Sequence, residues 1–183
     1  MRSNGRSKIS DEEQKQGRGV EPRPFVLPTH RKLYGRRKGP KLSAYQQGLV
    51  DTLLPHLAID PEMGRDARAY FASPPPQGLR PPAFPQAGGG IAAQPMTGVD
   101  DIADVWLEVG FGGGEHLAWQ AERNPTIGMI GCEPYVAGVA KLLTKIVDNN
   151  ISNIRLYTED ARDVLAALPA VSLGRAFILF PDP

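Results

Sequence analysis

The sequence is poor in cysteine and histidine: it has one cysteine, Cys132, and three histidines among 183 residues. A single cysteine excludes an internal disulfide framework and a cysteine-based zinc module, and it is typical of a reducing compartment. The histidines lack the spacing of metal ligands, so we expect no metal. No apolar run approaches the ~18–20 residues of a membrane span, and the basic residues 1–10 precede no apolar stretch. We therefore expect a cytoplasmic protein with no membrane association and no secretory signal.

Acidic residues are scarce at the start of the chain. Residues 1–41 hold twelve Lys/Arg against four Asp/Glu, a net charge of +8, whereas residues 42–183 hold nine against sixteen, a net charge of −7. A basic arm on an acidic body is typical of proteins that bind nucleic acid. A solubilising tail is the alternative that charge alone leaves open.

Composition divides the chain before residue 99 into three segments. Residues 1–30 are too poor in apolar side chains to offset chain entropy, so we expect a disordered tail. Residues 31–72 are predicted to be a basic N-terminal segment with a helix, which Ser43 caps and Pro55 ends or kinks. Residues 73–98 hold seven prolines and five glycines in 26 positions, which indicates a linker or an inserted loop.

From residue 99 on, short apolar runs alternate with helical patterns. Strands are predicted at 105–109, 127–132, 153–157 and 176–180, and helices at 115–124, 134–147 and 164–168. This alternation predicts an α/β fold, a Rossmann-like, doubly wound parallel sheet. Such sheets usually hold about six strands. We therefore expect residues 99–183 to be the N-terminal part of a domain whose C-terminal strands are missing.

Each predicted strand delivers a carboxylate at or just beyond its carboxyl end, which is where open parallel sheets bind ligands. These carboxylates are Glu108, Glu133, Asp160 and Asp182. A helix N-cap or first-turn acid explains one such residue, but four at equivalent ends favour a ligand site. Asp182 stands between two prolines that restrict its backbone, although a rigid turn leaving the sheet also fits this pattern.

The turn after the first predicted strand is rich in glycine, with Gly110, Gly112, Gly113 and Gly114 followed by Glu115. A dinucleotide fingerprint would place its third glycine at position 115, where a glutamate opposes a pyrophosphate. The turn instead favours S-adenosylmethionine, a nucleoside ligand without phosphate, although a tight turn without a ligand remains open.

Two further positions suit a nucleoside. Glu133 lies 23 residues after Gly110, where such folds hold two ribose hydroxyls with a carboxylate. Asp160 and Ala161, at the end of the third predicted strand, are expected to lie at the adenine.

Residues 104–183 resemble the bacterial tRNA (guanine-N7-)-methyltransferases. The matching runs are LEVGFGGGEHLAWQAERNP, IGCEPYVAGVAKLL, NIRLYTEDARDVL and SLGRAFILFPDP. The order GFGxGEH, GxEP, DAR, FPDP is specific to this family, and RKLYGRRKGPKLSAYQQGLVDTLLPHLAID is similar to its basic N-terminal approach. Two departures stand out: the family pattern continues beyond the second proline of FPDP, and residues 73–98 are longer than usual.

The resemblance implies a class I methyltransferase fold, S-adenosylmethionine as cofactor, and methylation of guanine N7 in the variable loop of tRNA. By position, Glu108, Glu133 and Asp160 match the family's cofactor-contacting acids, and Asp182 matches its aspartate of the cofactor and active site. A second group would contact tRNA phosphates: Arg36, Arg37, Lys38 and Lys41. We expect a monomer. A non-catalytic RNA-binding fragment and an NAD-dependent oxidoreductase remain as alternatives.

Overall fold

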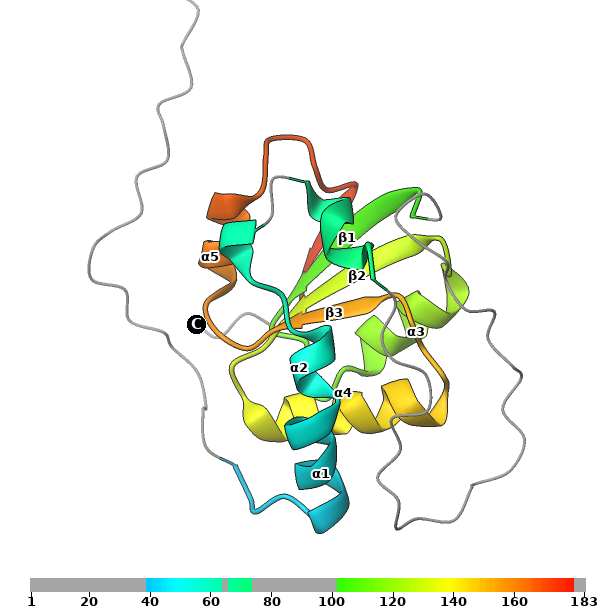
Figure 1. Cartoon of the computed structure of the whole chain (residues 1–183), viewed down its shortest axis with the longest axis vertical. Helices are drawn as coiled ribbons and strands as arrows, with labels where there is room; N and C mark the ends of the chain where they lie inside the picture. The colour runs from blue at the N-terminus through cyan, green and yellow to red at the C-terminus, as the bar shows by residue number, and fades with distance from the viewer. Residues whose placement is uncertain (1–38, 64–65, 74–101, 180–183) are drawn as a thin grey trace, which may run out of the picture.

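A parallel sheet of four strands forms the centre of the molecule (Figure 1). The computed structural model describes residues 39–63, 66–73 and 102–179. The spatial order β3-β2-β1-β4 is built from β1 (Asp104–Val109), β2 (Ile127–Cys132), β3 (Ile154–Tyr157) and β4 (Arg175–Ile178). The chain steps outward from β1 to β3 and then returns to the other side of β1. The predicted doubly wound α/β sheet is therefore confirmed.

Three helices connect the strands, and α1 and α2 precede the sheet in sequence. The connecting helices are α3 (Glu115–Arg123), α4 (Val136–Asp148) and α5 (Ala161–Ala167). The earlier elements are α1 (Ala44–Thr52), α2 (Leu54–Leu57) and two short 3₁₀ helices, η1 (Pro61–Met63) and η2 (Ala67–Phe71). Figure 1 shows α3 and α4 below the sheet and α5 above it.

Each face of the sheet carries its own apolar cluster. The cluster on the α3 and α4 side also takes side chains from α1 and α2, and it includes Leu49, Leu57, Leu117, Met129, Leu142 and Leu143. The cluster on the α5 side includes Phe71, Val105, Leu107, Ile130 and Val164. Burial of side chains of this size contributes ~1.5–3 kcal/mol each. The elements that precede residue 74 therefore pack into the same core as the sheet.

The break between α1 and α2 follows from local chemistry. Ser43 Oγ accepts from the backbone N–H of Gln46 at 3.1 Å, and the Gln46 side chain accepts from the Ser43 N–H at 3.2 Å. This reciprocal capping confirms the predicted helix start. Leu53 separates the two helices, and Pro55 follows in the first turn of α2, because proline has no N–H to continue the α1 ladder.

The start of α4 differs from its prediction. Tyr135 is the N-cap residue, so Pro134 precedes the helix and does not lie in its first turn. Val136, the first residue of the helix, is an apolar side chain and yet 46% exposed. The buried face is instead wide, because α4 lies between the sheet and α1, and it comprises Ala137, Gly138, Val139, Ala140, Leu142, Leu143 and Ile146.

The fourth strand is the least covered of the described strands. Ile178, at its carboxyl end, is 61% exposed, whereas the residues of β2 after Ile127 are all buried. The strand begins at Arg175, one residue before the predicted start of 176–180, and it runs to Ile178 within the described residues. The predicted tail (residues 1–30) and nearly all of the proline- and glycine-rich stretch (residues 74–98) lie outside the described residues, so both remain predictions.

Among the helices in the described ranges, none combines the length and apolar character needed to cross a bilayer.

Candidate functional site

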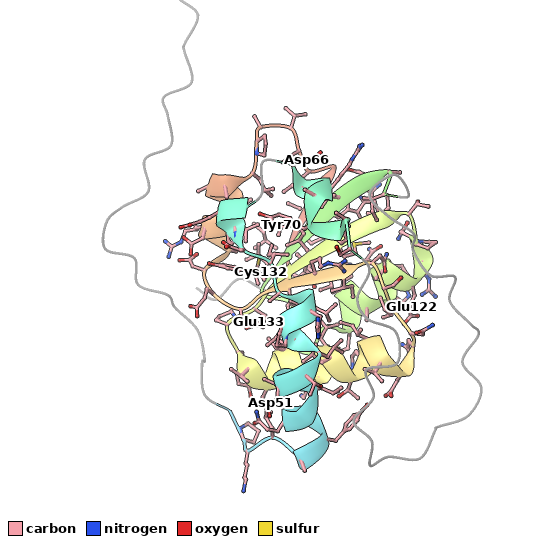
Figure 2. The ribbon with its side chains drawn as sticks, viewed as in Figure 1. Asp51, Asp66, Tyr70, Glu122, Cys132 and Glu133 are labelled. Carbon is pink, nitrogen blue, oxygen red and sulfur yellow. The ribbon has the colours of Figure 1, made fainter. Side chains whose placement is uncertain are left out.

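Three of the predicted carboxylates lie along one edge of the sheet. The strands end in register, with Val109 beside Cys132 and Cys132 beside Tyr157. Glu108 is the penultimate residue of β1, Glu133 directly follows β2, and Asp160 lies beyond β3. Figure 2 places the labelled Cys132 and Glu133 at this edge, close to the start of α4. The expectation that the strand ends gather these side chains therefore agrees with the fold.

The turn after β1 has the backbone that only glycine adopts readily. Gly110, Gly112 and Gly114 have φ values of 71°, 57° and 73°, in the left-handed region. A Cβ at Gly110 or Gly112 would meet no atom within 4 Å, whereas one at Gly114 would lie 2.7 Å from Leu142 Cδ1. The first two glycines therefore leave open space beside the backbone, and the third allows the turn to pack on α4.

Glu133 connects this turn to the second strand. Its Oε2 accepts from the N–H of Gly112 at 2.8 Å, and its Oε1 accepts from the N–H of Tyr135 at 2.9 Å. The residue is only 7% exposed. Two backbone donors offset the cost of burying this carboxylate and fix its direction. Each oxygen keeps one lone pair for a further donor.

A further glycine, Gly138 in the first turn of α4, lets that helix approach the glycine turn. A Cβ at Gly138 would overlap the carbonyl oxygen of Gly112 and lie 3.3 Å from the ring of Tyr135. Tyr135 also contacts the start of the described chain, because a Cβ at Gly39 would lie 2.5 Å from its hydroxyl oxygen. Gly39, at the start of the described residues, therefore lies beside the Tyr135 side chain.

Glu108 is the most deeply buried of the three carboxylates, with 2% exposure. Its Oε2 accepts from His116 Nδ1 at 2.7 Å, across the start of α3. Burial raises the pKa of the Glu108 carboxyl, and the hydrogen bond and charge interaction with His116 oppose this effect. The imidazole is held by ring contacts with Phe177 and Trp119, at centroid distances of 5.0 and 6.4 Å.

Asp160 caps α5 and pairs with an arginine of that helix. Its Oδ1 accepts from the Arg162 N–H at 2.9 Å, and both carboxylate oxygens contact the Arg162 guanidinium. The Asp160 carboxylate raises the pKa of the exposed Arg162 through its hydrogen bond. Ala161 begins the helix directly after this cap.

The acid at the first position of α3 argues against a pyrophosphate at this edge. A Cβ at Gly113 would lie 2.7 Å from both carboxylate oxygens of Glu115, so this carboxylate lies against the glycine turn. Backbone hydrogen bonding lowers the pKa of Glu115, and Lys145 pairs with it at 3.3 Å. A negative charge therefore lies where a dinucleotide-binding helix would present its N–H groups to phosphate.

Several predicted residues are not brought to this edge by the described structure. Lys41 is described and exposed, two residues before the Ser43 cap of α1. Asp182 and the basic residues Arg36, Arg37 and Lys38 lie outside the described residues. Their assignments remain predictions.

The residues at this edge fit S-adenosylmethionine. The space beside Gly110 and Gly112, which a Cβ would fill, admits a ligand close to the backbone, and Glu133 keeps acceptor capacity for ribose hydroxyls. Within the described ranges, no cluster of three or more His, Cys, Asp or Glu side chains could hold a metal ion.

Sequence reasoning missed Gly138 and His116. A glycine inside a strongly helical run is a signal for close backbone approach, and here it lies four positions after the last residue of GxEP. No comparable signal marks His116, because its partner Glu108 lies in a different element eight residues earlier.

Comparison with known proteins finds methyltransferases. Residues 103–183 match a family model described as "Putative methyltransferase". The chain is 44% identical over 152 residues to a tRNA (guanine-N(7)-)-methyltransferase of Rhodopseudomonas palustris (strain BisB5), covering 82% of this chain and 49% of the relative. The resemblance to the tRNA (guanine-N7-)-methyltransferases that the sequence motifs indicated is confirmed.

Two further relatives carry the same name. One, from Bradyrhizobium diazoefficiens, is 44% identical over 160 residues, covering 85% of this chain and 55% of the relative. The other, from Ruegeria sp. (strain TM1040), is 44% identical over 153 residues, covering 84% and 52%. The chain thus spans about half the length of the curated relatives it matches.

Proposed function

We propose that the protein transfers a methyl group from S-adenosylmethionine to N7 of a guanine in the variable loop of tRNA. The observation that carries this proposal is the hydrogen bond from the Gly112 N–H to Glu133, which joins the glycine turn after β1 to the acid after β2. The 44% identity to proteins named tRNA (guanine-N(7)-)-methyltransferase supports the reaction class.

The geometry of the carboxyl edge supports a cofactor role for each of its predicted residues. Glu133 would accept from the two ribose hydroxyls with its remaining lone pairs. Gly110, Gly112 and Gly114 would let the ligand approach the backbone, and Asp160 with Ala161 would border the adenine. Glu108 would supply a negative charge near the turn.

Guanine N7 carries an in-plane lone pair, so the attack on the methyl carbon needs no general base. When bound, S-adenosylmethionine supplies that methyl group on a cationic sulfur. The tasks left to the chain are to align the reacting atoms and to exclude water. Asp182 would accept an N–H of the guanine edge, which favours the positive charge that the ring gains.

The basic segment would bind tRNA through its phosphates. Arg36, Arg37, Lys38 and Lys41 would position the substrate without reading its sequence. We expect that removal of residues 1–41 flattens the slope of log affinity for tRNA against log salt and leaves cofactor affinity nearly unchanged. An unaltered slope would contradict a role for this segment. A tRNA substrate also places the proposed activity in the cytoplasm, and we propose a monomer.

The decisive experiment is methyl transfer from labelled S-adenosylmethionine to unmodified tRNA. We would assay the 183-residue chain and, in parallel, a chimera that adds the C-terminal half of the Rhodopseudomonas relative, each with its Asp182→Ala variant. Label at guanine N7 that disappears in the Asp182→Ala variant is the expected result. Binding of tRNA and cofactor without transfer in both proteins would instead favour a non-catalytic RNA-binding protein.

A further inference from the structure

The hydrogen bonds around His116, whose imidazole binds Glu108, define its tautomer. Asn124 Nδ2 donates to Gln120 Oε1 at 3.3 Å, so the amide nitrogen of Gln120 faces the imidazole. That nitrogen lies 3.2 Å from His116 Nε2 and can only donate. His116 Nε2 is therefore the acceptor, and Nδ1 carries the hydrogen that is donated to Glu108.

The imidazole is more exposed than the carboxylate that it binds. The His116 side chain is 33% exposed, whereas the Glu108 side chain is 3% exposed. A carboxylate buried to this extent is costly unless a donor satisfies it. Among the hydrogen bonds described for Glu108, the side-chain donor is His116.

Neighbouring rings fix the orientation of the imidazole. Phe177 of β4 is the register partner of Glu108, and its ring meets the His116 ring edge-on at 5.0 Å. Trp119, one turn along α3, stacks at 6.4 Å with an interplanar angle of 22°. Rotation of the imidazole away from Glu108 would therefore disturb contacts with both rings.

This arrangement lies where the strand order reverses. The chain winds from β1 toward β3 on one side and to β4 on the other, so β1 and β4 border the switch point of the sheet. Glu108 belongs to β1 and Phe177 to β4, and the glycine turn starts two residues after Glu108. A carboxylate held in one direction at this point attracts the cationic part of a ligand.

We propose that His116 is a positioning residue, which holds the Glu108 carboxylate in the direction that the cofactor requires. The inference rests on the proposed function, because it assigns Glu108 to the cationic part of S-adenosylmethionine. It predicts that what matters at position 116 is an N–H donor at the place of Nδ1, and not the imidazole ring itself.

The test compares His116→Asn with His116→Leu. The Asn Nδ2 occupies the place of His Nδ1, whereas Leu fills similar space without a donor. We expect His116→Leu to weaken binding of S-adenosylmethionine by about tenfold, the effect of one hydrogen bond to a charged group. His116→Asn should stay within about threefold of the wild-type affinity. Calorimetry with the cofactor alone measures both values, and urea unfolding shows whether each variant is folded.

The outcomes separate this inference from the proposed function. Equal weakening by both variants, or unchanged binding by His116→Leu, would overturn the role of His116 while wild-type binding upholds the cofactor assignment. A wild-type chain that binds no S-adenosylmethionine would overturn the cofactor assignment itself. Nitrogen NMR of the wild-type protein can locate the hydrogen of the His116 imidazole directly. We expect it on Nδ1, and a hydrogen on Nε2 would contradict the proposal. In Glu108→Gln, we expect this hydrogen to shift to Nε2 or to exchange faster with solvent.

Discussion

The two halves of the carboxyl edge hold their carboxylates by different means. At the β2–β3 half, Glu133 accepts from two backbone N–H groups, and Asp160 accepts from one backbone N–H and from the Arg162 side chain. At the β1–β4 half, Glu108 accepts from the side chain of His116. Backbone donors survive almost every substitution, whereas a side-chain donor is lost with one change. The direction of the Glu133 carboxylate is therefore robust toward mutation of its neighbours, whereas that of the Glu108 carboxylate depends on one side chain.

The strand β4 is less well covered than the two strands of the β2–β3 half. Met129 and Ile130 of β2 and Leu156 of β3 are at most 1% exposed, whereas Ile178 of β4 is 61% exposed. Regions with few buried apolar contacts open locally at lower free energy than the core. Hydrogen exchange at the β4 amides should therefore be faster than at those of β2.

The glycine turn joins the two halves, and we expect the largest effect from breaking it. Gly112→Ala and Gly114→Ala both place a side chain at positive φ, which costs ~1–2 kcal/mol. Gly114→Ala also presses against Leu142, which adds about 1–3 kcal/mol of overpacking. Urea unfolding should therefore show a greater loss of stability for Gly114→Ala. Gly112→Ala should instead act mainly on cofactor affinity, and equal stability losses would contradict this division.

Glu133→Ala tests the half that relies on backbone donors. We expect it to weaken S-adenosylmethionine binding by about 1.5–3 kcal/mol, the value of hydrogen bonds to a charged group. Calorimetry measures the change, and Glu122→Ala is the matched control, because Figure 2 shows Glu122 at the other end of the sheet from Glu133. Unchanged affinity in Glu133→Ala would refute the assignment to ribose.

Glu108→Gln gives the smallest expected effect, because the hydrogen bond from His116 offsets part of the burial that raises the pKa of Glu108. A raised pKa means that the folded protein holds the proton more tightly than the unfolded chain. The group thus stabilises the fold below its ordinary pKa of 4.5, and this contribution is lost as pH rises through the raised value. Glu108→Gln should therefore gain stability relative to the wild type as pH rises above 4.5 in urea unfolding. A difference that stays constant or falls with pH would show that burial does not dominate.

The strands and the placement of the strand-end acids could be predicted from local sequence. Apolar runs such as residues 127–132 have the length and bounding residues of buried strands, and β2 spans exactly these residues. The parallel arrangement then brings Glu108 and Glu133 to one edge without further information. The Ser43 cap is equally local, because all its hydrogen bonds lie within four residues.

Contacts between distant segments could not be predicted in this way. Arg155 looks like an exposed strand residue, yet it is 3% exposed and donates to the carbonyl oxygens of Tyr70 and Ser73, more than 80 residues earlier. Burial lowers the pKa of Arg155 to about 10. The wide buried face of α4 has the same origin, because its cover, α1, comes from a segment that precedes the sheet.

The contact of Gly138 with the glycine turn makes stability and cofactor binding depend on the same residue. Glycine inside a helix costs ~1 kcal/mol relative to alanine, but the clash that alanine would make here costs about 1–3 kcal/mol. Alanine at position 138 would displace the Gly112 carbonyl and, with it, the N–H from which Glu133 accepts. Screens for thermal tolerance should therefore favour substitutions elsewhere on α4 and should leave Gly138 unchanged.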